Sequence, residues 1–117
     1  MMNERRQRRS AERDAALGFL LESVMARSDV SAIAIVDGRG FVVAGKGTDQ
    51  ELVILGTVAA PVAAGIVSRT CERLTEGTDV ISKKMSCPGG PLYLAALGSR
   101  VRRMNDAVCG ALRILAA

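Results

Sequence analysis

The chain has 117 residues, of which 49% are hydrophobic and 24% are charged, the balance of one folded domain. Only 3% are aromatic, which disfavours base-stacking nucleic-acid modules, and the absence of histidine removes the usual general base and the commonest metal ligand. The formal net charge of +4 is concentrated in an arginine-rich N-terminus, and the rest of the chain is nearly balanced.

The three cysteines, Cys71, Cys87 and Cys109, indicate neither a disulfide framework nor a zinc site, because their number is odd and no C-x-x-C spacing occurs. We therefore expect no metal, no cofactor and a reducing, cytoplasmic location. Acidic residues interrupt the basic start and no cleavage site follows, which argues against a signal peptide. The uncharged stretch 52–68 is shorter than the roughly 20 residues of a membrane span.

Residues 1–11 are polar and arginine-rich without apolar periodicity, which predicts a flexible basic arm ahead of a domain at 12–117. Such an arm is usually solvated, although it could also contact phosphates or an anionic membrane surface. Residues 12–27 are predicted to form an amphipathic helix, because apolar side chains recur at helical spacing: Ala16, Leu17, Leu20, Leu21, Val24 and Met25.

A β-hairpin is predicted next. Residues 30–36 are rich in β-branched side chains and too short for a surface helix, and residues 41–45 form a second apolar strand. Residues 37–40, Asp-Gly-Arg-Gly, are the turn, since glycine allows the positive φ that tight hairpins need.

The segment 49–76 predicts a long helix, capped by Thr48 or Asp49 and ended by Gly77. Its first four turns are apolar nearly all round, so two faces must be buried, and a second copy of the chain would cover the small-residue face. The sequence therefore predicts a homodimer. Pro61 lacks an N–H and predicts a kink or break at 57–61.

A second hairpin and a last helix complete the chain. Apolar and polar residues alternate over 79–87, and residues 92–97 are a short apolar run, so both segments are predicted to be strands joined by the turn at 88–91. An apolar stripe from residue 101 onward predicts the final helix. The predicted order is therefore α-β-β-α-β-β-α, which places the chain in the α/β (α+β) class.

The segment 30–44, with its strand, Asp-Gly-x-Gly turn and short apolar strand followed by an alanine-rich helix, resembles the roadblock family of dynein light chain-like domains, bacterial type. The resemblance covers 12–117 and implies a roadblock-like (profilin-like) three-layer sandwich, an antiparallel sheet with helices on both faces. A fifth strand common in the family is missing here. The resemblance implies dimerisation through the second strand and second helix, at Phe41, Val42, Val43, Ala44, Gly56, Ala60, Ala64 and Val67.

Members of that family are noncatalytic adaptors and regulators of small Ras-like GTPases. The resemblance thus implies a noncatalytic homodimeric regulator or scaffold that binds such a GTPase. Arg69 and Arg73, one turn apart on the long helix, are the predicted partner-binding residues, with Arg100, Arg102 and Arg103 as the alternative. Two other functions stay open: a sensory or ligand-binding α/β module, and a basic nucleic-acid accessory protein.

Overall fold

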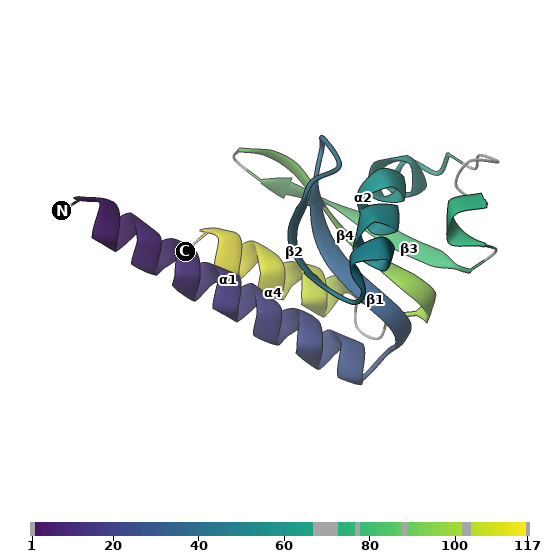
Figure 1. Cartoon of the computed structure of the whole chain (residues 1–117), viewed down its shortest axis with the longest axis horizontal. Helices are drawn as coiled ribbons and strands as arrows, with labels where there is room; N and C mark the ends of the chain where they lie inside the picture. Colours follow the sequence, from purple (N-terminus) through teal and green to yellow (C-terminus); the bar gives the residue numbers. More distant parts are fainter. Residues whose placement is uncertain (1, 67–72, 77, 88, 102–103, 117) are drawn as a thin grey trace.

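Four antiparallel strands form a sheet in the computed structural model, which describes residues 2–66, 73–76, 78–87, 89–101 and 104–116 (Figure 1). Their order across the sheet is β2-β1-β4-β3. Residues 73–75 add one helical turn before β3. The predicted α/β (α+β) class is confirmed. The elements are α1 (Met2–Ala26), β1 (Asp29–Asp37), β2 (Val42–Lys46), α2 (Asp49–Ala63), β3 (Val80–Cys87), β4 (Gly90–Arg100) and α4 (Met104–Ala116).

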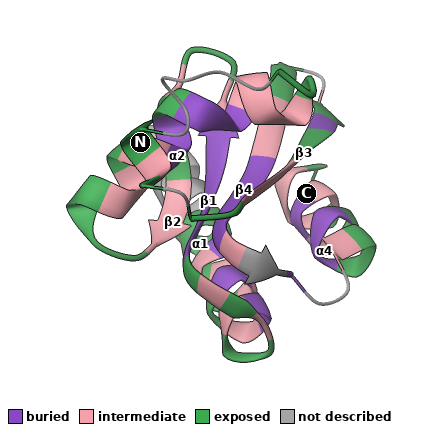
Figure 2. Cartoon of the chain, turned by 90° about the vertical axis from the view of Figure 1, so that its right-hand side faces the viewer, coloured by how far each residue is buried: buried purple, intermediate pink, exposed green. Residues whose placement is uncertain are grey.

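Helices cover both faces of the sheet. α1 and α4 lie side by side on one face, and α2 lies on the other (Figure 1). Alternation along β1 explains this layering, because Ile33 and Ile35 join the core under α1 and α4, whereas Ala34 and Val36 join the core under α2. Figure 2 shows that the buried residues concentrate on the central strands β1 and β4 and on the helix sides that face them.

The core under α2 is built mainly from small side chains. Leu55 is the one fully buried leucine of that helix, and it packs with Ala59 above the strands. Opposite them the sheet presents mostly alanine, so α2 can approach it closely. The sheet residues of this cluster are Ala32, Ala34, Val36, Ala95 and Leu97. Larger side chains that are only partly buried pack against this cluster, among them Leu52 and Ile54 of α2.

The predicted flexible arm is helical. Residues 2–11 continue α1, which runs from Met2 without a break. The physical reason is composition, since residues 2–17 contain neither glycine nor proline and are rich in residues that lose little side-chain freedom in a helix. Figure 1 shows this helix projecting beyond the sheet. Of the side chains described, Leu17 is the first that joins the core, so the boundary at residue 12 is not one of secondary structure.

The predicted long helix ends early. α2 stops at Ala63, and Gly65 adopts a φ of 75°, which only glycine takes at little cost. The N–H of Gly65 donates to the Val62 carbonyl at 3.0 Å and that of Ile66 to the Pro61 carbonyl at 2.9 Å, the two hydrogen bonds of a Schellman motif. The expected end at Gly77 is thus wrong, and Pro61 lies in the last turn of α2 rather than at a mid-helix kink.

The sheet of the described residues has no fifth strand, as the sequence predicts. β4 extends to Arg100 instead of ending at residue 97, and α4 begins at Met104. Gly98 pairs with Val30 of β1, and the register of the two strands shifts on either side of this pair. The four strand segments were therefore predicted correctly, with β4 longer than expected.

A capping box starts α2. The Thr48 hydroxyl accepts a hydrogen bond from the Glu51 N–H at 3.2 Å, and the Glu51 carboxylate accepts one from the Thr48 N–H at 3.0 Å. The second hydrogen bond holds the pKa of Glu51 below its ordinary value.

We expect Thr48→Ala to lower the free energy of unfolding by about 1 kcal/mol, because one helix N–H loses its acceptor.

A carboxyl group whose pKa is lowered by folding stabilises the fold above its unfolded pKa and loses this effect as the pH falls through the folded pKa. Glu51→Gln should therefore flatten the acid side of the stability–pH profile. Urea unfolding at several pH values checks both variants, and an unchanged acid slope in Glu51→Gln would refute the assignment.

Candidate functional site

The outer edge of β2 exposes apolar side chains that the sequence assigned to a dimer interface. β2 is the end strand of the sheet and pairs with β1 on one side. Phe41, just before it, is 67% exposed, and Val42 and Val43 are 37% and 39% exposed. Ala44 instead packs against the core under α1 and α4. Three of the four predicted strand residues are therefore exposed, and Ala44 is half-buried.

The β1–β2 turn holds Phe41 in place. The Asp37 carboxylate accepts hydrogen bonds from the Arg39 N–H at 2.8 Å and from the Phe41 N–H at 3.0 Å. The Asp37 N–H donates to the Phe41 carbonyl at 2.9 Å, and Gly40 adopts a φ of 93°. The predicted Asp-Gly-Arg-Gly turn is confirmed, and its aspartate supplies the local hydrogen bonds that fix the backbone at Phe41.

Gly56 has a partner within the same chain, contrary to the expectation that the small-residue face awaits a second copy. A Cβ added at Gly56 would lie 2.5 Å from the Gly40 carbonyl oxygen, so the β1–β2 turn packs directly on α2 there. Gly56 is buried by this contact. Beside it is a hollow of about 350 Å³ lined by Gly38, Arg39, Gly40, Gly56, Thr57 and Ala60. Gly56 is therefore a packing residue of the fold.

The other predicted helix residues are not equivalent to one another. Ala60 is half-buried beside the hollow, and Ala64 is exposed at the end of α2. Val67 lies outside the described residues. Val53, which the prediction missed, is 68% exposed on α2. The sequence contained a signal for this exposure. α2 is apolar on all sides and only one side can cover the sheet, so the apolar residues on its other side face outward.

We call the exposed apolar residues Phe41, Val42, Val43 and Val53 the edge face. The strand and the helix that carry them pack against each other. A β-bulge lies within this face, because Val36 pairs with Val42 and Ile35 with Ala44, which leaves Val43 as the extra residue. A bulge interrupts ladder pairing at an edge, so a partner would contact Val43 mainly through its side chain.

The two predicted partner-binding arginines do not share a long exposed helix. α2 ends at Ala63, so neither Arg69 nor Arg73 belongs to it. Arg73 is exposed in the helical turn 73–75, and Arg69 lies outside the described residues. The two arginines were placed together because the sequence was interpreted as one uninterrupted helix, and Gly65 overturns that premise.

The charged groups near the edge face are few. Lys46 at the end of β2 forms an ion pair with Glu22 of α1 at 3.0 Å, with both side chains solvent-accessible. Over the described part of the chain, no group of three or more Cys, Asp or Glu could hold a metal ion. No helix there has the length and apolar character needed to cross a membrane. The four side chains of the edge face are themselves apolar.

Comparison with family models, with curated proteins and with solved structures finds no match to this chain.

Proposed function

We propose that the chain is a noncatalytic, cytoplasmic homodimer that regulates or positions a small Ras-like GTPase. The observation that carries the dimer is the edge face. Edge strand β2, which has a neighbouring strand on one side only, and the adjacent helix α2 both expose apolar side chains there. Exposed apolar groups gathered on neighbouring elements mark interaction sites, since leaving them in water is unfavourable.

A second copy of the chain is the occupant that the edge face fits best. A two-fold axis beside β2 would bring the same four side chains of each copy together, as an isologous interface requires. All four side chains are apolar, and the exposed Arg39 lies two positions before Phe41. The dimer also agrees with the resemblance of segment 30–44 to roadblock domains.

The first test is Val43→Glu, which places a carboxylate in the edge face. Burying it against its symmetry mate would cost more than the lost apolar contact, so we expect a monomer at concentrations of about 20 µM, where wild type is a dimer. The control is Lys84→Glu, which adds a carboxylate to the exposed side of the opposite edge strand β3. Sedimentation velocity separates the outcomes, and a dimeric Val43→Glu protein would place the interface elsewhere.

The GTPase part of the proposal rests on the resemblance, and exposed Arg73 is compatible with an acidic partner surface. We expect the chain carrying both Arg69→Glu and Arg73→Glu to bind a purified Ras-like GTPase at least tenfold more weakly, while remaining dimeric. Fluorescence anisotropy with the GTPase in its GDP and GTP states measures this. Unchanged affinity at physiological salt would exclude these arginines as the contact, and no binding by wild type would exclude the GTPase.

A further inference from the structure

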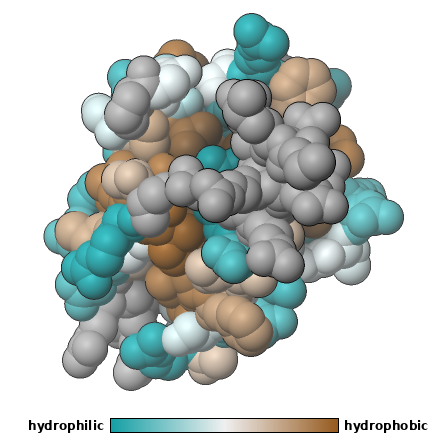
Figure 3. Space-filling model, turned by 90° about the vertical axis from the view of Figure 1, so that its left-hand side faces the viewer, coloured by the Kyte–Doolittle hydropathy of each residue, from teal (hydrophilic) through white to brown (hydrophobic). Residues whose placement is uncertain are grey.

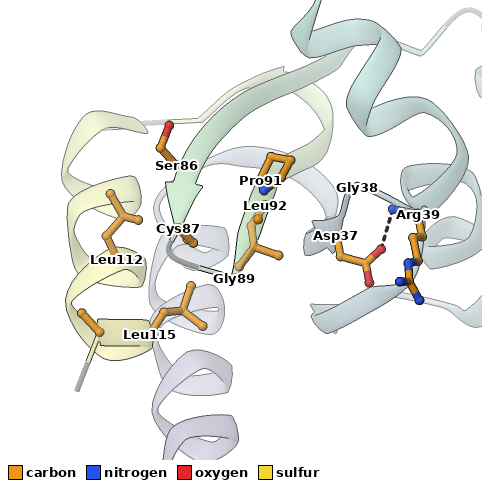
Figure 4. A pocket seen from close by; sticks show the side chains of 12 residues that line it. Asp37, Gly38, Arg39, Ser86, Cys87, Gly89, Pro91, Leu92, Leu112 and Leu115 are labelled. Atoms are coloured by element: carbon orange, nitrogen blue, oxygen red, sulfur yellow. Dashed lines mark hydrogen bonds between the residues drawn. The ribbon is translucent and has the colours of Figure 1, made fainter.

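A cavity of about 870 Å³ opens at the end of the sheet that carries the two hairpin turns (Figure 4). Three separate elements form its walls: the β1–β2 turn, the β3–β4 hairpin and the last turn of α4. Figure 4 shows Leu112 and Leu115 pointing from α4 toward Cys87 and Leu92 of the hairpin. Its volume lies in the range of small-molecule sites.

The sequence of α4 explains why this space is left open. Val108 and Ala111 are buried under the sheet, whereas Leu112 and Leu115 lie at the end of the helix and are only partly buried. The hairpin opposite offers Gly89, at which an added Cβ would meet no atom within 4 Å. Small residues on one wall and incompletely covered leucines on the other leave an apolar cavity that the described residues do not fill.

The surface of this end agrees with that description. Figure 3 views the molecule from the side on which the N-terminus projects, and it shows apolar surface between hydrophilic patches. Covering apolar groups that are in contact with water lowers the free energy, so this surface favours an apolar ligand.

The polar groups of the cavity determine which charge a ligand should carry. Asp37 and Arg39 are its two oppositely charged side chains, so the described lining is formally neutral. One oxygen of Asp37 already accepts two N–H groups of the turn, which fixes the carboxylate at the cavity wall. A charged ligand would meet one like charge as well as one opposite charge, and would lose hydration against the apolar wall.

We propose that this cavity binds an uncharged, mainly apolar small molecule. The leucines of α4 and the hairpin contact its apolar body, and the β1–β2 turn at Asp37 faces a hydrogen-bonding end group. The cavity lining shares no residue with the edge face, and the proposal does not depend on the proposed GTPase.

Two fluorescent probes with the same aromatic frame test the proposal. N-phenyl-1-naphthylamine is neutral, and 8-anilinonaphthalene-1-sulfonate adds a sulfonate. We expect saturable binding of one neutral probe per wild-type chain, with at least tenfold weaker binding of the sulfonate. Absence of saturable binding by the neutral probe would overturn the site, and equal or tighter binding of the sulfonate would overturn the assignment of an uncharged ligand.

Two variants locate the probe. Leu115→Glu places a charge on the apolar wall, and Gly89→Trp reduces the open volume; each should weaken neutral-probe binding at least tenfold. The controls are Leu74→Glu, which adds the same charge at an exposed leucine, and Phe19→Trp, which introduces an indole ring at an exposed residue; both positions lie outside the lining. Circular dichroism establishes folding, and Gly89→Trp decides if Leu115→Glu is unfolded. Wild-type affinity in the folded cavity variants would overturn the proposal. Retained binding in Val43→Glu would separate this site from the dimer.

Discussion

Replacing Gly98 with alanine is expected to cause the largest loss of stability among single substitutions in the sheet. The new Cβ would overlap the Asp29 carbonyl oxygen and lie 2.5 Å from the Cα of Val30, both on the neighbouring strand. Gly98 also has a φ of 148°, a conformation that residues with a Cβ rarely adopt. Overlap with backbone atoms and backbone strain together should lower the free energy of unfolding by about 3 kcal/mol or more.

Gly89→Ala is the matched control for this prediction. An added Cβ at Gly89 meets nothing within 4 Å, and its φ is not in the left-handed region. The same chemical change there should leave the free energy of unfolding unchanged or raise it slightly, because alanine reduces the freedom of the unfolded chain. Urea unfolding followed by circular dichroism compares the two. Equal stability of both variants would contradict the pairing of β1 with β4 at Gly98.

Leu55→Ala is expected to have the second large effect, a loss of about 3–5 kcal/mol. Leu55 is fully buried, and it is the main large side chain that α2 contributes to the alanine-rich core on its side of the sheet. The small side chains opposite Leu55 carry few atoms, so they cannot fill the space that the substitution leaves. In the Leu55→Ala variant, the backbone amides of α2 should therefore exchange hydrogen faster than those of α1.

Phe19→Ala is the control, since it removes a larger side chain that is 72% exposed on α1. Its effect should stay within about 0.5 kcal/mol, as for most surface substitutions. A similar loss in both variants would indicate that α2 does not depend on Leu55 for its attachment to the sheet.

The strands and turns could be predicted because their signals are local. The β-branched run ending at Val36 and the Asp-Gly-Arg-Gly turn determine the first hairpin within a few residues. The capping box also follows from neighbouring residues, with Thr48 and Glu51 three positions apart. Each of these features depends on contacts between residues close in the chain.

The helix boundaries were harder to predict because the competing signals have similar strength. Gly65 ends α2, although the apolar pattern continues beyond it, and the choice depends on how the Schellman turn packs. The N-terminal arginines suggested a solvated arm, yet their intrinsic helix propensity is high enough to continue α1. The spacing of apolar residues does not show whether a glycine ends a helix or whether arginines extend one.

The candidate sites depend on contacts between distant residues. Gly56 resembled an interface residue in the sequence, but Gly40 lies against it in the fold. The cavity joins residues near 37, 90 and 115, which no local pattern connects. The exposed residues Phe41, Val42 and Val43 were named through the family resemblance, and no local pattern placed their strand at the edge of the sheet.

The equilibrium mass of the wild-type chain in solution tests the central claim most directly. Sedimentation equilibrium at about 20 µM should give twice the 12.3 kDa mass of one chain, because the edge face is apolar and unpaired in the monomer. A mass of one chain at this concentration would contradict the proposed homodimer.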